Sequence, residues 1–150
     1  MSGTSMRFAR MTSYAMDAIV GKQFRSRGGR LRVGQVGILE LATIGRRSGR
    51  ARSVILSHYS RTEDGYVVIG TNAGSRHQPG WYYNISADPR VAVTADGLTQ
   101  TMLARIVTGT ERRRLLRLFV LRGYGIPALL VAALLIGTRT VPIVVLHRTR

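Results

Sequence analysis

Short runs in which hydrophobic and polar residues alternate fill much of the chain after residue 35. Such alternation is typical of strands with one buried face. The runs that we interpret as strands are Val36–Ile44, Ser53–Ser60, Tyr66–Thr71, Val91–Ala95, Thr99–Val107 and the final "TVPIVVLHR". Thr62–Gly65 and Ala95–Gly97 each contain Asp-Gly between two runs, which is a strong signal for a tight hairpin turn.

Helical patterns flank these runs. Met6–Lys22 has loosely helical apolar spacing, and a basic linker, "FRSRGGRLRVGQ", follows it. The stretch "PGWYYNISADP" predicts one short helix that ends at Asp88-Pro89, because a residue before proline disfavours helix. Thr110 is the predicted N-cap of a helix running to about Arg122, with Glu111 at its positive end. An apolar helical piece leads from there to the final strand.

Several antiparallel strands with few helices predict an α+β fold that is mainly β, a small, partly open β-barrel with flanking helices. At 150 residues the chain is long enough to bury a sizeable core. We expect two parts. Residues 1–35 form the N-terminal amphipathic helix and the basic linker, and residues 36–150 form the barrel domain.

The charge is strongly one-sided, with 23 Lys and Arg against 7 Asp and Glu and a net charge of +16. Such a balance indicates an anionic partner: nucleic acid, an acidic membrane surface or a phosphorylated small molecule. Lys22 is the only lysine, and arginine suits bidentate binding of phosphate and carboxylate, although a codon bias toward arginine explains scattered positions equally well. The longest apolar stretch, Ile126–Gly137, is too short to span a bilayer. We expect a cytoplasmic protein, with possible peripheral contact at the inner membrane face.

Few kinds of catalytic chemistry fit these residues. The chain has no cysteine, and most of its acids sit in predicted turns or at helix ends, so a paired-carboxylate site is not expected. His58, His77 and His147 share no metal-ligand spacing, and we predict no metal. The sequence "GRRSG" matches neither a nucleophile elbow nor a P-loop. If the protein is an enzyme, a bound cofactor must carry out the chemical step that its side chains cannot.

The first candidate motif is "IGRRSGRARSV", whose arginine-rich part, residues 45–52, we call the arginine loop. Two glycines allow a tight turn, and four arginines can surround one phosphate or polycarboxylate from several sides. The alternative is a solvated hairpin tip.

The second candidate motif is "GTNAGSRHQPGWYYN", residues Gly70–Asn84. Its small residues allow a flat ligand to approach backbone N–H groups, and its aromatic residues provide a wall for a ring. The alternative is that Trp81 and one tyrosine plug the end of the barrel.

Together the two motifs resemble the deazaflavin-dependent nitroreductase family, actinobacterial proteins with a split, FMN-binding-like β-barrel that use coenzyme F420, an 8-hydroxy-5-deazaflavin. The resemblance covers roughly Leu39–Glu111 and the final strand. It implies that the arginine loop holds the phosphate and the first carboxylates of the oligoglutamate tail. The positions it implies for coenzyme binding are Arg46, Arg47 and Ser48 for the anionic arm, Arg52, Ser53, Val54 and Ile55 toward the ring, Ile69, Gly70, Thr71 and Asn72 beyond them, and Gly80, Trp81, Tyr82, Tyr83 and Asn84 in the short helix.

This chain departs from the family pattern in three places. Asn72 stands where some members have lysine, and the second strand lacks a proline common in relatives. Family members also bring tyrosines over the ring from the late helical region, where Tyr124 is the only tyrosine here. Tyr124 is a candidate proton donor or substrate contact, or else it marks a helix end.

These observations favour an F420H2-dependent oxidoreductase that passes a hydride to an electron-poor acceptor such as a quinone, an enone or a nitro compound. One alternative is a non-catalytic F420 carrier. Another is a protein that binds nucleic acid or a membrane surface, suggested by Arg112, Arg113, Arg114 and Arg117 on one late helix.

Overall fold

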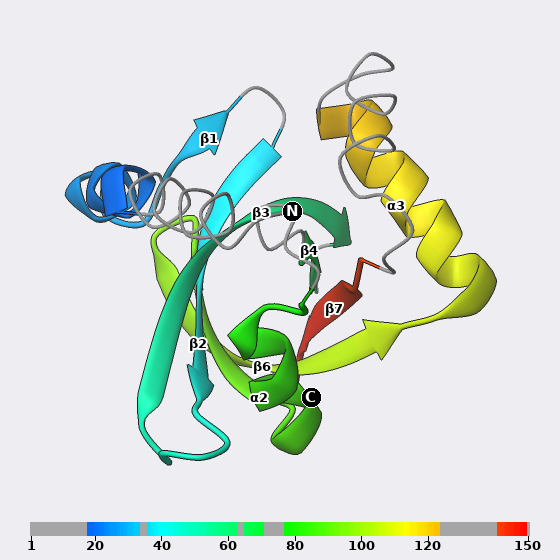
Figure 1. The fold of residues 1–150 in the computed structure, drawn as a ribbon. Coiled ribbons are helices and arrows are strands. Elements are labelled where there is room, and N and C mark those ends of the chain that lie inside the picture. Colours follow the sequence, from blue (N-terminus) through cyan, green and yellow to red (C-terminus); the bar gives the residue numbers. More distant parts are fainter. Residues whose placement is uncertain (1–17, 34–35, 63–64, 71–76, 124–140, 150) are drawn as a thin grey trace, which may run out of the picture.

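The computed structural model describes residues 18–33, 36–62, 65–70, 77–123 and 141–149. Seven strands form one sheet in the order β1-β2-β3-β4-β7-β6-β5, and β5 pairs back with β2, so that six of the strands close a barrel (Figure 1). The predicted β-barrel is therefore confirmed. The strands are β1 (Arg32–Val33), β2 (Val36–Ile44), β3 (Ala51–Thr62), β4 (Gly65–Ile69), β5 (Arg90–Ala95), β6 (Leu98–Val107) and β7 (Ile143–Arg148).

Alternate residues of the strands point into the barrel, as their period of two requires. Closure places Leu41 of β2 opposite Val93 of β5, and both side chains are fully buried. The Asp96-Gly97 hairpin joins β5 to β6 with positive φ at both residues, as predicted for this turn. The central part of the predicted β3–β4 turn lies outside the described residues.

One strand was not expected. β1 lies in the stretch predicted as a linker, where it pairs with the start of β2 and the Ile38 N–H donates to the Leu31 carbonyl. The linker prediction is wrong at these residues. The two residues of β1, Arg32 and Val33, are too few to show the alternation that indicates a strand, and the start of β2 provides their pairing.

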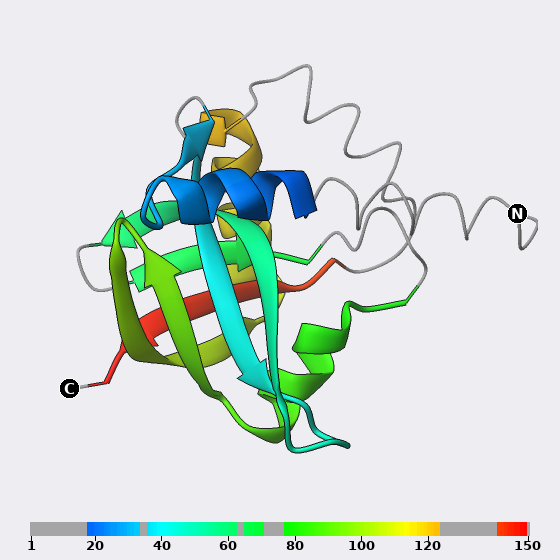
Figure 2. The ribbon, with the colours of Figure 1, turned by 90° about the vertical axis from the view of Figure 1, so that its left-hand side faces the viewer.

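The described part of the N-terminal helix covers residues 18–26, and the rest of the predicted span lies outside the described residues. It runs past the predicted end at Lys22, and Phe24 beyond that end is buried, with 1% of its surface exposed. Arg25 donates to Glu40 of β2 at 3.0 Å. Figure 2 shows this helix lying across the outer face of β2.

Two helices follow, α2 (Gly80–Ala87) and α3 (Gly109–Gly123). The short helix α2 ends before Asp88-Pro89 as predicted. The prediction of Thr110 as N-cap of α3 is wrong, because the helix begins at Gly109, two residues earlier than predicted, and the Arg112 N–H donates to the Thr108 carbonyl. In Figures 1 and 2, α3 lies on the opposite side of the barrel from helix 18–26.

The barrel holds one buried histidine at the end of β2 remote from the arginine loop. His58 lies opposite Gly37 and is 1% exposed, and its two ring nitrogens have no hydrogen-bond partner among the described residues. A side chain at position 37 would collide with its Nε2 atom, so glycine makes room for the ring. Burial lowers the pKa of His58 to about 4, opposed by Asp96 and assisted by Arg32. His58 is therefore neutral at physiological pH.

Candidate functional site

The arginine loop is a tight turn with a defined backbone. Ile44 and Ala51 are the last paired residues of β2 and β3, and the Gly45 N–H donates to the Arg50 carbonyl at 2.8 Å. The Gly49 N–H donates to the Gly45 carbonyl at 2.8 Å, and Gly49 has φ +65°, which favours glycine. Ser48 Oγ accepts the Arg50 N–H at 3.2 Å. The loop is therefore ordered by its own hydrogen bonds, and Arg52 belongs to β3.

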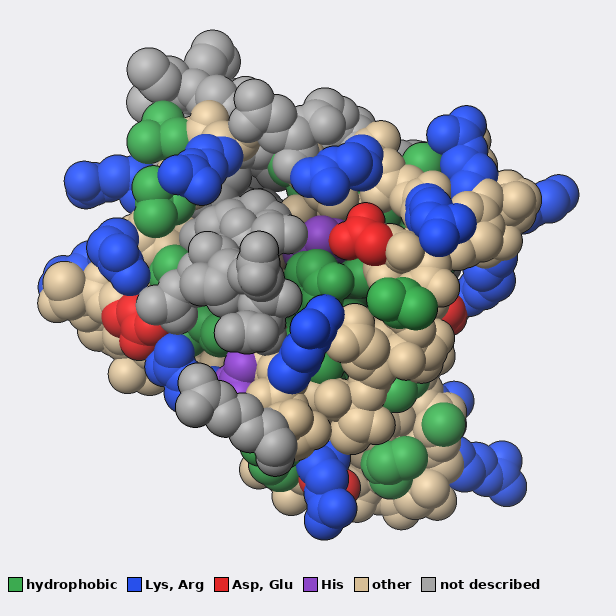
Figure 3. All heavy atoms as spheres, turned by 180° about the vertical axis from the view of Figure 1, so that it is seen from behind, with side chains coloured by type: hydrophobic (Ala, Val, Ile, Leu, Met, Phe, Trp, Pro, Cys, Tyr) green, Lys and Arg blue, Asp and Glu red, His purple; other side chains and the backbone are tan. Residues whose placement is uncertain are grey.

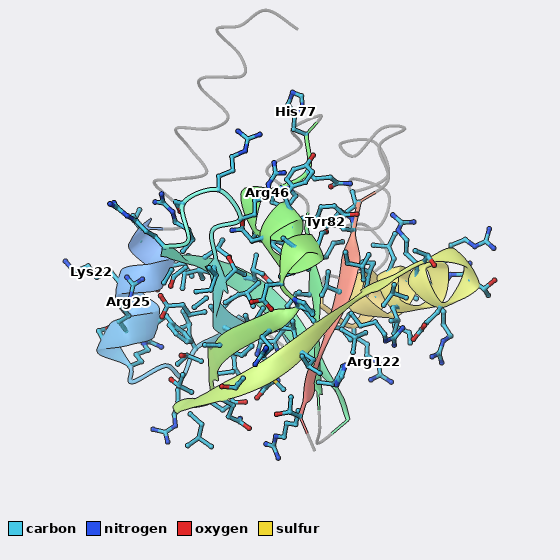
Figure 4. All side chains as sticks on the ribbon, turned by 90° about the horizontal axis from the view of Figure 1, so that it is seen from below. Lys22, Arg25, Arg46, His77, Tyr82 and Arg122 are labelled. Carbon is cyan, nitrogen blue, oxygen red and sulfur yellow. The ribbon has the colours of Figure 1, made fainter. Side chains whose placement is uncertain are left out.

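The two predicted motifs meet where α2 touches this loop. Asn84 Oδ1 accepts the Arg46 N–H at 3.1 Å, and Asn84 Nδ2 donates to Thr43 Oγ1 at 3.0 Å. The guanidinium carbon of Arg46 lies 4.8 Å from the centre of the Tyr83 ring, a cation–π contact. Figure 4 shows Arg46 beside Tyr82 of α2, with His77 farther out on the same side. The arginine loop and α2 thus form one continuous surface.

The arginines of this surface face solvent, without acidic partners among the described residues. Arg46, Arg47 and Arg50 are exposed, and so is Arg52. Among the described residues, the ion pairs between side chains join Arg25 to Glu40 and Arg105 to Glu111, both away from the loop. Figure 3 shows the same imbalance over one face, where Lys and Arg are widespread and Asp and Glu appear in few places. Such a set of guanidinium groups fits a phosphate followed by carboxylates.

The aromatic residues of α2 divide between core and surface. Trp81 is 7% exposed and joins Ile85 in the core, so its side chain occupies the end of the barrel. Tyr82 is half-buried against the same core, and Tyr83 is 37% exposed, with the two rings edge to face at 5.5 Å. Of these three side chains, Tyr83 presents the most accessible ring to a ligand.

Gly70 lies directly after β4 in a crowded position. Its N–H donates to the Pro142 carbonyl at 3.0 Å, and a Cβ there would lie 2.8 Å from Pro142 Cγ and 3.1 Å from Trp81 Cζ2. Glycine is therefore needed for this close approach. Ile69 is half-buried on the side of α3. Thr71, Asn72 and Tyr124 lie outside the described residues.

The predicted β3 positions face different surroundings. Arg52 pairs with Thr43, close to Asn84, whereas Val54 packs against the core. Ile55 is half-buried beneath helix 18–26, and a Cβ on Gly21 would lie 3.3 Å from its Cγ1 atom. The side chain of Ile55 therefore lies under that helix, and a ligand near the loop would meet its backbone. Thr43 was not predicted, and its one signal is a hydroxyl on the inward face of β2, which Leu39 and Leu41 otherwise make apolar.

A hollow of about 280 Å³ lies beside the same hairpin. Its walls are mainly small, and include Ala42, Ile44, Ala51 and Ala92, with Thr43, Arg90 and Thr101 as polar members. It contains none of the positions predicted for coenzyme binding. Among the described residues, no cluster of three or more histidine, aspartate or glutamate side chains is arranged to hold a metal ion.

Comparison with known proteins identifies the family. The sequence model of a family described as "F420H(2)-dependent quinone reductase" matches residues 14–148. The chain belongs to this family. It is 34% identical over 55 residues to the F420H(2)-dependent quinone reductase of Mycobacterium tuberculosis strain H37Rv. That match covers 37% of this chain and 36% of the relative's length.

Solved structures agree with this family. A structure named as an F420-H2 dependent reductase superposes with a TM-score of 0.62 and 26% identity, over 73% of this chain and 93% of that one. A protein of unknown function from Agrobacterium tumefaciens, at 14% identity and TM-score 0.54, covers 97% of this chain and 54% of its own, and supports the fold alone. The predicted resemblance to F420-dependent reductases is confirmed. Within the described residues, none of the helices is long and apolar enough to cross a membrane.

Proposed function

We propose that this member of the quinone reductase family is an F420H2-dependent oxidoreductase that passes a hydride to an electron-poor acceptor. A quinone is the first acceptor to test, because the family carries that name; enones and nitro compounds come next. The observation that carries the proposal is the arginine loop. Its backbone is held against α2, and its guanidinium groups have no acidic partner among the described residues.

In this proposal the chain's own residues bind the coenzyme and orient it. Arg46, Arg47 and Ser48 would hold the phosphate and the start of the tail, since Ser48 keeps a hydroxyl proton to donate. Arg52 and the backbone of residues 53–55 would follow toward the ring, as would residues 69–72. Tyr82 and Tyr83 would border it from α2. When bound, the reduced deazaflavin supplies the hydride. Tyr124 is the proposed proton donor to the reduced acceptor.

The test is a spectrum. The protein is mixed with F420H2 and a soluble quinone, and the absorbance of oxidised F420 is followed in time. The proposal expects tight binding and turnover. It also expects F420 to bind more tightly than FMN in the same buffer, because four arginines exceed what one FMN phosphate needs. Tighter binding of FMN than of F420 would contradict the assignment of F420 as the coenzyme.

The alternative functions give different outcomes in the same assay. A non-catalytic carrier would bind F420 and F420H2 but would not oxidise the reduced form with any quinone, enone or nitro compound. A nucleic-acid binder would bind neither. The arginine loop favours the coenzyme-binding functions, because it gathers its arginines at one turn.

We further infer peripheral contact with an anionic membrane face through α3. Arg113, Arg114 and Arg117 are exposed on this helix, and Leu121 adds an exposed apolar side chain. The apolar sequence Ile126–Gly137 follows shortly after. Basic side chains next to apolar ones are typical of helices that lie on lipid headgroups, and quinones with long tails dissolve in such membranes.

A further inference from the structure

Both polar atoms of the Asn84 side-chain amide make hydrogen bonds to other groups of the protein. Its Oδ1 atom accepts the backbone N–H of Arg46, and its Nδ2 atom donates to the hydroxyl of Thr43. Thr43 is 2% exposed. The two contacts also settle which end of the amide is oxygen, because a backbone N–H needs an acceptor. Asn84 therefore joins three elements: α2, β2 and the arginine loop.

The support behind Asn84 is rigid. Trp81 and Ile85 fix α2 to the barrel core on either side of it along the helix, and Thr43 belongs to a paired strand. Tyr83, the preceding residue, holds the Arg46 guanidinium over its ring. Helix α2 thus fixes both the main chain and the side chain of the first arginine in the loop.

We propose that Thr43 and Asn84 form a brace that positions the arginine loop for the phosphate end of the coenzyme. Asn84 is then a positioning residue rather than a direct coenzyme contact. The proposal rests on the proposed function. Its physical basis is preorganisation: a loop already held in its binding conformation loses less entropy when the ligand arrives. The brace acts on a part of the ligand remote from the ring, so it affects binding and leaves the chemical step unchanged.

Substitutions at Thr43 test the brace without touching the coenzyme. Thr43→Val keeps the shape and removes the hydroxyl, whereas Thr43→Ser keeps the hydroxyl and is the matched control. Each variant is titrated with two oxidised ligands: F420, and the deazaflavin alcohol that has the ring and ribityl chain but no phosphate or tail.

Thr43→Val should weaken F420 binding roughly fivefold to tenfold, the effect of about one hydrogen bond, and should not change binding of the alcohol. In turnover, KM for F420H2 should rise with kcat unchanged, and Thr43→Ser should match the wild type. Asn84→Ala, which removes both hydrogen bonds, should show the same selectivity with a larger loss. If Thr43→Val does not fold, Asn84→Ala serves as the variant in which the affinities for F420 and for the alcohol are compared.

The outcomes separate the two proposals. If the wild type binds F420 and both brace variants bind it equally well, the brace is wrong and the function stands. The brace is also wrong if F420 and the alcohol weaken by the same factor, because that result reflects general loss of structure. If the wild type does not bind F420, the proposed function fails and the brace fails with it.

Discussion

Protonation of His58 should destabilise the fold between neutral and mildly acid pH. The imidazole has an ordinary pKa of 6.5 in the unfolded chain and about 4 when buried in the barrel. At pH 5 the unfolded state has therefore taken up a proton that the folded state has not. Because the unfolded state binds more protons, stability falls as pH drops below 6.5 and levels off below 4.

The magnitude follows from the two pKa values. Each pKa unit corresponds to about 1.4 kcal/mol, so the full loss is about 3 kcal/mol, and about 2 kcal/mol of it is reached by pH 5. This is a large part of the stability of a small domain. Asp96 and Arg32 also act on His58, in opposite directions, but burial is the largest cause.

Urea unfolding at several pH values measures this loss. Trp81 is the only tryptophan and is buried, so its fluorescence reports on the core. His58→Leu removes the titrating group and should lose about 2 kcal/mol less than the wild type between pH 7 and pH 5. Val68→Ala is the control, since Val68 pairs with His58 but does not titrate, and its curve should run parallel to that of the wild type. A His58→Leu curve that also runs parallel would refute the reasoning.

Three further predictions concern function. Arg47→Ala should raise KM for F420H2 roughly tenfold to hundredfold with kcat nearly unchanged, as loss of a charge-assisted contact remote from the ring requires; unchanged coenzyme affinity would make the loop a solvated hairpin tip. Tyr124→Phe should lower kcat and leave the Kd of F420 unchanged, and a variant with full kcat would exclude the hydroxyl as proton donor. Exchanging Arg114 and Arg117 for glutamate should reduce sedimentation with vesicles of anionic phospholipid while turnover of a soluble quinone stays the same, and equal sedimentation would argue against the α3 surface.

Most of the barrel could be predicted because alternation is a local property. β2 was predicted at its observed bounds, since buried apolar residues such as Leu39 and Leu41 alternate along it and each end has a turn signal. β3 begins two residues before its predicted start, because the hydrogen bond between Gly45 and Arg50 extends pairing to Ala51. β1 pairs with the start of β2 only three to five residues further along the chain, but its two residues are too few to show an alternating pattern.

The candidate site was harder to predict in detail. The motif "WYYN" indicates that aromatic and amide groups gather in one helix, but not which way each side chain faces. That depends on docking: Trp81 and Ile85, four residues apart, form the buried face of α2. This docking places Asn84 beside Thr43 and the arginine loop, where its side-chain amide makes hydrogen bonds to Thr43 and to the backbone of Arg46.

The place of β7 in the barrel has a consequence for biosynthesis. β7 lies between β4 and β6, and its residues Ile143, Val144 and Leu146 are fully buried. It is also the last of the described strands in chain order, so a ribosome makes the other six before the barrel can close. Until then β4 and β6 have unpaired edges and uncovered apolar faces, which are the surfaces that chaperones bind and that aggregate. We expect a nascent chain without residues 143–148 to be protease-sensitive, and to gain resistance in one step when β7 is released from the exit tunnel.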